Sequence, residues 1–298
     1  MRVLMIFCLA AWVAFGATAQ ADDQPRIVTV NYPLQYFAER LVGDAAEVVY
    51  PVPAGVDPSF WRPSIADISA VQSADLILLS GAGFATWIDR VSLPRSRLVN
   101  TAAGYRDRFI ATETITHSHG DGGEHSHEGI ATYTWLDPTL AIAQAEAVAA
   151  AIAGRGIADP TQVYAEFATL RADLEALDAD ARAALAGAQD VVFIATHPRY
   201  QYLAQAYDLT IVSLEWEAGT APTQDQLDDL ASRVADDGAR ILIWEAEPPQ
   251  DAKDAAAALG LVNVTVPPLA KPVDADFAAS FRTSVAALAD AAAEFHSQ

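Results

Sequence analysis

Residues 160–185 read PTQVYAEFATLRADLEALDADARAAL. Apolar side chains recur in this stretch at intervals of three and four, at Val163, Phe167, Leu170, Leu174, Leu177, Ala181 and Leu185. That spacing places them on one face of a helix, and charged residues fill the other face. With a rise of 1.5 Å per residue the helix is about 40 Å long. It is therefore long enough to run the length of a two-domain molecule.

The segment before this helix alternates between strand-like and helical patterns. Apolar strand patterns at 27–30, 47–52 and 75–79 are separated by helical patterns at 33–41 and 65–73. This order is typical of a parallel sheet with helices on its faces. Pro138 suits the first turn of a further helix at 139–153.

The segment after the long helix repeats the same alternation. Strand patterns occur at 191–195, 210–214, 239–244 and 262–266, with helical patterns between and after them. We therefore predict an α/β protein with two parallel-sheet lobes joined by a long rigid helix. The N-terminal lobe would span 22–137, the connecting helices 138–187 and the C-terminal lobe 188–298. A ligand cleft is expected between the lobes, because ligands of open α/β sheets gather at strand ends.

The composition is strongly acidic. Asp and Glu number 39 against 18 Lys and Arg, which gives a formal net charge of −21. This argues against nucleic acid and anionic membranes as partners, because both need a basic face, and it is compatible with a cation. The hydrophobic content of 52% excludes a disordered chain.

The first 21 residues have the pattern of a cleavable signal peptide. Arg2 precedes an apolar run at 3–15 that is short for a membrane span. Ala17-Thr18-Ala19 and Ala19-Gln20-Ala21 both fit the small-x-small cleavage rule. We expect export to the periplasm and removal of Cys8, the only cysteine, so the mature chain would have neither a disulfide nor a Cys-based zinc site. The alternative is an anchor that is never cut.

Four of the six histidines fall within eleven residues. His117, His119, His125 and His127 form two His-x-His pairs beside acidic residues and three glycines. Imidazoles at short spacing on a flexible backbone can converge on a divalent metal. The alternative is a solvated loop.

Five short motifs occur in order along the chain. They are Asn31-Tyr32-Pro33-Leu34, Val56-Asp57-Pro58 with Pro63, Ala74-Asp75-Leu76, Trp135-Leu136-Asp137-Pro138 and His197-Pro198-Arg199-Tyr200-Gln201-Tyr202-Leu203. With the histidine-rich segment, they make the mature chain resemble the zinc/manganese class of ABC-transporter solute-binding proteins. The resemblance implies a metal ion in the cleft, delivery to an ABC permease of the inner membrane, and a histidine-rich insert that collects or senses zinc. We expect a monomer.

The chain departs from that family at three of the positions that the resemblance implies as metal ligands. Ser59 and Tyr133 stand where the family has histidines, and Pro267 stands where it has an aspartate. Only His197 matches a family ligand. Because one imidazole cannot hold zinc tightly, either the cleft has stopped binding metal or other groups complete the site.

Carboxylates at the ends of two predicted strands are candidate replacements. Glu215 with Glu217, and Glu245 with Glu247, follow consecutive apolar strands, and alternation would send each pair to one side. The predicted metal ligands are therefore His197, Glu215, Glu245, Glu247 and, more weakly, Asp57. Such an oxygen-rich site suits Zn²⁺, with Mn²⁺ as the alternative. The alternative is that these residues bind no metal: the glutamates would be solvated, and Asp57 would only stabilise a turn.

Other residues are predicted to line the cleft. Ser59, Trp61, Tyr133 and Trp216 lie near predicted cleft elements, and the aromatic ones could instead be core residues. Arg199 could pair with an acidic ligand, although surface salt bridges are the commoner fate of arginine.

The sequence does not suggest an enzyme. It has no Gly-x-Ser-x-Gly or phosphate-binding loop, and no cysteine outside the predicted signal peptide. We predict an exported solute-binding protein of a metal ABC importer, with zinc as the first candidate. The alternatives are the same fold with a cleft adapted to a chelated metal or another small solute, and a periplasmic metal-storage protein or metallochaperone.

Overall fold

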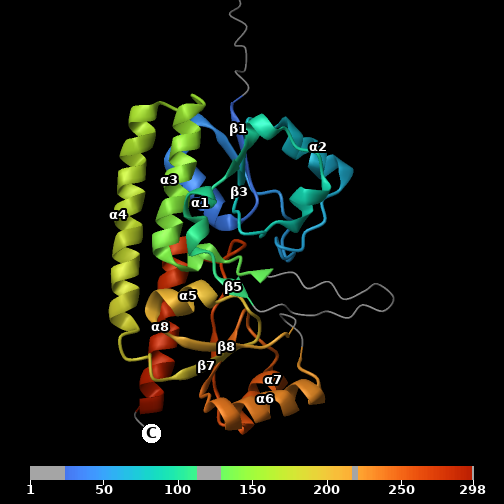
Figure 1. Cartoon of the computed structure of the whole chain (residues 1–298), viewed down its shortest axis with the longest axis vertical. Coiled ribbons are helices and arrows are strands. Elements are labelled where there is room, and N and C mark those ends of the chain that lie inside the picture. The colour runs from blue at the N-terminus through green and yellow to red at the C-terminus, as the bar shows by residue number, and fades with distance from the viewer. Residues whose placement is uncertain (1–23, 113–128, 217–220, 297–298) are drawn as a thin grey trace, which may run out of the picture.

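Two α/β lobes, each built on a four-stranded parallel sheet, make up the molecule (Figure 1). The computed structural model describes residues 24–112, 129–216 and 221–296. The N-terminal sheet has the strand order β2-β1-β3-β4. Its strands are β1 (Arg26–Thr29), β2 (Glu47–Val49), β3 (Leu76–Leu79) and β4 (Leu98–Asn100). The predicted fold class is confirmed.

The C-terminal sheet has the strand order β10-β9-β7-β8. Its strands are β7 (Val192–Ala195), β8 (Thr210–Ser213), β9 (Ile241–Trp244) and β10 (Val262–Thr265). The helices between them are α5 (Gln201–Tyr207), α6 (Gln224–Asp237) and α7 (Gln250–Ala258). Each strand is short, and the two central strands, β7 and β9, are mostly buried, as expected for a parallel sheet covered by helices.

Three long helices pack side by side on one flank of the molecule, and α4 extends from the N-terminal lobe to the C-terminal lobe (Figure 1). They are α3 (Pro138–Gly154), α4 (Pro160–Ala184) and α8 (Phe277–His296). Helix α4 buries the predicted apolar face, from Val163 to Ala181, against α3, α8 and α1 (Tyr32–Val42). The spacing of apolar residues at 160–185 therefore predicted this helix and its buried face correctly.

The remaining elements of the N-terminal half are short. Besides α2 (Ile65–Ser73), they are the 3₁₀ turns η1 (Gly43–Ala45), η2 (Thr86–Arg90), η3 (Arg95–Arg97), η4 (Ala103–Arg108) and η5 (Thr134–Leu136). Strands β5 (Ala111–Thr112) and β6 (Gly129–Ile130) pair antiparallel. The four clustered histidines and the predicted signal peptide lie outside the described residues.

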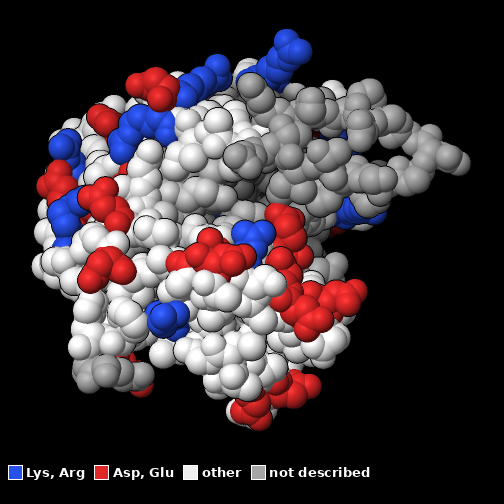
Figure 2. Space-filling model, turned by 60° about the horizontal axis from the view of Figure 1, so that its bottom comes forward, with Lys and Arg blue, Asp and Glu red and all other residues white. Residues whose placement is uncertain are grey.

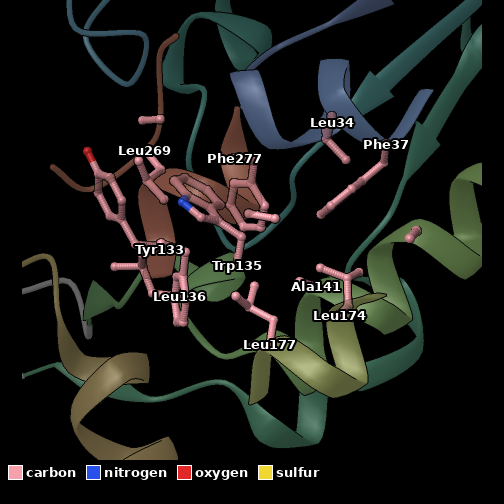
Figure 3. Packing of buried hydrophobic residues seen from close by; sticks show 14 of the residues in the cluster. Leu34, Phe37, Tyr133, Trp135, Leu136, Ala141, Leu174, Leu177, Leu269 and Phe277 are labelled. Atoms are coloured by element: carbon pink, nitrogen blue, oxygen red, sulfur yellow. The ribbon is translucent and has the colours of Figure 1, made fainter. Parts of the chain in front are cut away.

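The two lobes share a continuous apolar core. One cluster of buried residues includes Ile27 and Val28 of β1 together with Phe193 and Ala195 of β7. At its centre, Trp135 is fully buried against residues of α1, α4 and α8 (Figure 3). Burial of apolar surface stabilises a folded structure. Because both lobes contribute residues to this one core, it helps to hold them together. Among the described residues, no helix is long and apolar enough to cross a membrane.

Candidate functional site

His197 lies in the loop after β7, just before α5. Its Nδ1 is 2.7 Å from the carbonyl oxygen of Trp216. A carbonyl oxygen can only accept a hydrogen bond, so Nδ1 carries the hydrogen and Nε2 of the neutral ring keeps its lone pair. The backbone of Trp216 therefore leaves His197 with one nitrogen suited to a metal ion.

Arg199 is buried at the centre of the site, with an exposed fraction of 5%. Its Nε donates a 2.7 Å hydrogen bond to Oε1 of Glu245, which follows β9 in the C-terminal lobe. Its Nη2 donates a 2.7 Å hydrogen bond to Oδ2 of Asp57, in the loop after β2 of the N-terminal lobe. The guanidinium carbon lies 4.8 Å from the centre of the Tyr133 ring. Arg199 thus connects carboxylates from both lobes while it stacks on an aromatic ring.

Asp57 is the N-terminal acid of this site. Its Oδ1 accepts hydrogen bonds from the backbone nitrogen of Ser59 at 2.8 Å and from the Ser59 hydroxyl at 2.5 Å. Burial alone would raise the pKa of Asp57, but the charge of Arg199 and the hydrogen bonds from Ser59 and Arg199 outweigh it and lower the pKa. Asp57 is therefore ionised at neutral pH.

The site combines two carboxylates and an imidazole around one positive charge. Oε1 of Glu245 is 3.9 Å from Nδ1 of His197, and the Glu245 side chain is 7% exposed. Imidazole and carboxylate are ligand types that zinc uses in proteins. The positive charge among them here is the guanidinium of Arg199. Within the described ranges, no group of three or more His, Cys, Asp or Glu side chains is arranged to hold a metal ion.

Two tyrosine hydroxyls beside the site have unused hydrogen-bonding capacity. The hydroxyls of Tyr50 and Tyr133 are buried and have no hydrogen-bond partner among the described residues. Burial, and then the charge of Asp57, raise the pKa of Tyr50. The Tyr50 hydroxyl therefore stays protonated, and either hydroxyl could donate a hydrogen bond to a bound molecule.

Two of the predicted metal ligands, Glu215 and Glu247, are exposed to solvent. Glu247 is 70% exposed, pairs with Lys253, and accepts a hydrogen bond from the Thr265 hydroxyl. Strand β9 ends at Trp244, so the alternation of side chains does not extend to Glu247 and does not place it beside Glu245. The prediction that Glu245 and Glu247 face one side is therefore wrong; Glu217 lies outside the described residues.

The predicted cleft-lining residues divide into two groups. Ser59 and Tyr133 do contact the site, through Asp57 and Arg199 respectively. The Trp61 ring is instead buried against Trp87, with ring centres 5.4 Å apart. The Trp216 ring packs on Trp244 in a C-terminal core cluster. Both tryptophan rings are therefore core residues, which was the alternative to a cleft-lining position.

Arg199 has a larger role in the structure than its sequence context predicts. Instead of pairing with an acidic ligand, it is buried between two acids of the protein, Asp57 and Glu245. The signal was indirect: Arg199 lies two residues after His197, in a chain with a large excess of carboxylates.

Most of the acidic excess lies away from the site. Figure 2, in which the end carrying the C-terminal lobe comes forward, shows acidic side chains gathered in groups on that surface. Helix α6 alone exposes Asp225, Asp228, Asp229, Asp236 and Asp237. Many of the acidic residues are therefore solvated surface groups and do not belong to the candidate site.

Comparisons with known proteins identify similar chains. A family model described as zinc-uptake complex component A periplasmic (ZnuA) matches residues 27–291. The zinc-binding lipoprotein AdcA of Streptococcus pneumoniae is 28% identical over 240 residues, which cover 78% of this chain and 47% of that protein. The high-affinity zinc uptake system protein ZnuA of Bacillus subtilis is 26% identical over 214 residues, which cover 70% of this chain and 66% of that protein. The chain thus spans about half the length of the AdcA relatives it matches.

Solved structures show the same fold. The crystal structure of Zn(II)-bound AdcA from Streptococcus pneumoniae superimposes with a TM-score of 0.75 at 19% identity, covering 90% of this chain and 58% of that one. A crystal structure of ZnuA gives a TM-score of 0.72 at 24% identity, covering 91% of this chain and 100% of that one. At these identities the likeness establishes the two-lobed architecture.

Proposed function

The chain belongs to the family of periplasmic zinc-uptake complex component A (ZnuA) proteins, and we propose that it is the solute-binding protein of a zinc ABC importer. Proteins of this family bind solutes for transport and are not enzymes. The observation that carries the proposal is the position of His197, whose Nε2 is available, beside Glu245, which Arg199 joins to Asp57 of the other lobe.

In this proposal the site between the lobes captures one divalent cation. His197 supplies an imidazole nitrogen, and Asp57 and Glu245 supply oxygens from opposite lobes. This ligand set suits Zn²⁺, and Mn²⁺ is the second candidate because it prefers oxygen ligands. The loaded protein would deliver its ion to an ABC permease of the inner membrane. Zinc-binding relatives support this role.

The proposal extends to segments outside the described residues. Residues 1–21 would direct export to the periplasm as a cleavable signal peptide, and the mature protein would act as a monomer. His117, His119, His125 and His127 would collect zinc at lower affinity and raise its concentration near the site. The clustering of these four histidines in the sequence supports this part of the proposal.

Zinc titration calorimetry on the mature chain tests the function. We expect one tight site together with weaker sites that disappear when the four clustered histidines are replaced by asparagine. His197→Ala should remove the tight site. His296→Ala, which changes a histidine at the end of α8, should leave it unchanged. A wild-type chain that takes up neither zinc nor manganese would contradict the proposal.

A further inference from the structure

We propose that Arg199 is a tethered cation that occupies the interlobe site until a divalent metal displaces it. Arg199 then sets how strongly an ion must bind in order to be captured. This inference rests on the proposed function, because it concerns the same cation site.

The first support is geometric. The guanidinium directs Nε to Glu245 and Nη2 to Asp57, each at 2.7 Å, and so occupies one oxygen of each acid. These acids come from opposite lobes, and His197 is 3.9 Å from the same Glu245 oxygen. Two of the three groups proposed to hold the metal, Asp57 and Glu245, therefore already hold Arg199.

The second support is electrostatic. Two carboxylates and one guanidinium leave the cluster with a net charge of −1 when His197 is neutral. A divalent ion added beside the guanidinium would share its acceptor oxygens and be repelled by it. Arginine does not lose its proton at physiological pH, so it can relieve this repulsion only by moving away. Replacement of the guanidinium by a divalent ion would bring the cluster to neutrality.

The third support is a polar group that the present arrangement does not satisfy. The Tyr133 hydroxyl is buried without a partner among the described residues, and its residue is 4% exposed. Figure 3 shows this hydroxyl directed away from the apolar cluster that surrounds Trp135. An unsatisfied buried hydroxyl costs free energy. This hydroxyl is therefore available as a donor to a molecule that enters the site.

The competition has a measurable consequence. The Arg199 side chain must leave the site before a metal ion can bind. The population of protein with Arg199 in the site therefore lowers the apparent affinity for every ion by the same factor. Zn²⁺ binds imidazole and carboxylate more strongly than Mg²⁺ or Ca²⁺ does, so it can still fill the site at concentrations at which those ions no longer do. Arg199 therefore sets the affinity that an ion needs for capture.

The test compares zinc affinities in chains whose clustered histidines are all replaced by asparagine, so that only the interlobe site contributes. Arg199→Met removes the charge but keeps an apolar side chain on Tyr133. We expect it to tighten Zn²⁺ binding by about tenfold or more. Arg199→Lys, which keeps a positive charge, should gain much less. An affinity for Arg199→Met equal to or weaker than that of the parent would overturn the inference.

A second measurement on the wild-type chain covers the case in which Arg199→Met fails to fold. The Nε–H of Arg199, hydrogen-bonded to Glu245, should exchange slowly with solvent in the metal-free protein. Saturation with Zn²⁺ should abolish that protection, as followed by ¹⁵N NMR with Arg199→Lys for assignment. Protection that persists while zinc occupies a His197-dependent site contradicts displacement. Absence of any zinc binding would instead refute the proposed function.

Discussion

Nη2 of Arg199, in the C-terminal lobe, donates a 2.7 Å hydrogen bond to Oδ2 of Asp57, in the N-terminal lobe, across 142 positions of sequence. The same guanidinium is bound by Glu245. The lobes are thus joined by a charged contact as well as by the shared apolar core. Arg199 and Asp57 also belong to the proposed metal site. Changes in this contact should therefore affect both the stability of the folded protein and the binding of the metal ion.

Replacement of Glu245 by glutamine should destabilise the metal-free protein. The Arg199 and Glu245 side chains are only 6% and 7% exposed, so the change leaves a buried guanidinium with a weaker partner. We expect the free energy of unfolding in urea to fall by about 3 kcal/mol. Glu247→Gln is the matched control: that side chain is 70% exposed, and its loss should change the free energy of unfolding far less than the loss of Glu245 does. Equal effects from the two variants would contradict the burial argument.

The stability contribution of Asp57 should depend on acid pH. Because its folded-state pKa is depressed below the ordinary 3.8, ionised Asp57 favours the folded protein at neutral pH. That contribution is present above pH 3.8 and is lost as the pH falls through the depressed folded-state value. We expect wild type to be more stable than Asp57→Asn at pH 6, with a difference that shrinks below pH 3.8. A difference that stays constant down to pH 2 would show that the carboxylate charge is not involved.

The apolar face of α4 should account for much of the stability of the two-lobed arrangement. Leu170 is fully buried on this helix. Leu170→Ala should lower the free energy of unfolding by about 3 kcal/mol, since it removes buried methyl groups and leaves a cavity. Glu166→Ala, on the exposed face of the same helix, should change it by less than about 0.5 kcal/mol. The prediction fails if Leu170→Ala is as mild as its control.

His296 should titrate above its ordinary pKa. Its Nε2 lies 3.1 Å from both oxygens of Asp190, and this hydrogen bond, with one to the Ala292 carbonyl, raises the pKa of His296 above 6.5. The pair therefore stabilises the folded protein below pH 6.5, and this contribution is lost as the pH rises through the folded-state value.

Proton NMR titration of His296 measures this directly. The midpoint should lie above 6.5 in wild type and should fall in Asp190→Asn. Identical midpoints in the two proteins would exclude the Asp190 interaction as the cause.

Sequence patterns predicted regular elements well and irregular ones poorly. The strands and helices of both lobes, and the buried face of α4, appear close to where apolar periodicity placed them. The stretch from Thr86 to Arg108 was not predicted, because it consists of 3₁₀ turns and the three-residue strand β4. Elements so short have no room to repeat a period.

The surroundings of the candidate metal ligands could not be predicted, for a related reason. Arg199 joins Asp57 to Glu245, which lies beside His197, while Glu247 pairs with Lys253. Strand alternation cannot be extended past the last paired residue, because beyond Trp244 the backbone leaves the sheet. As a result the Glu245 side chain is buried and the Glu247 side chain is exposed, although the two residues are only two positions apart.

The sequence by itself determined the two α/β halves, the long helix and the presence of His197 after a strand. These follow from interactions between near neighbours, in which the spacing of apolar side chains decides which face is buried. Only the tertiary structure decided what His197 and Arg199 contact. Asp57 and Glu245 lie 142 and 46 positions from Arg199, and their approach depends on strand order and on how the lobes pack. A buried charge must be compensated by whichever opposite charges the fold brings to it, and for Arg199 these are one carboxylate from each lobe.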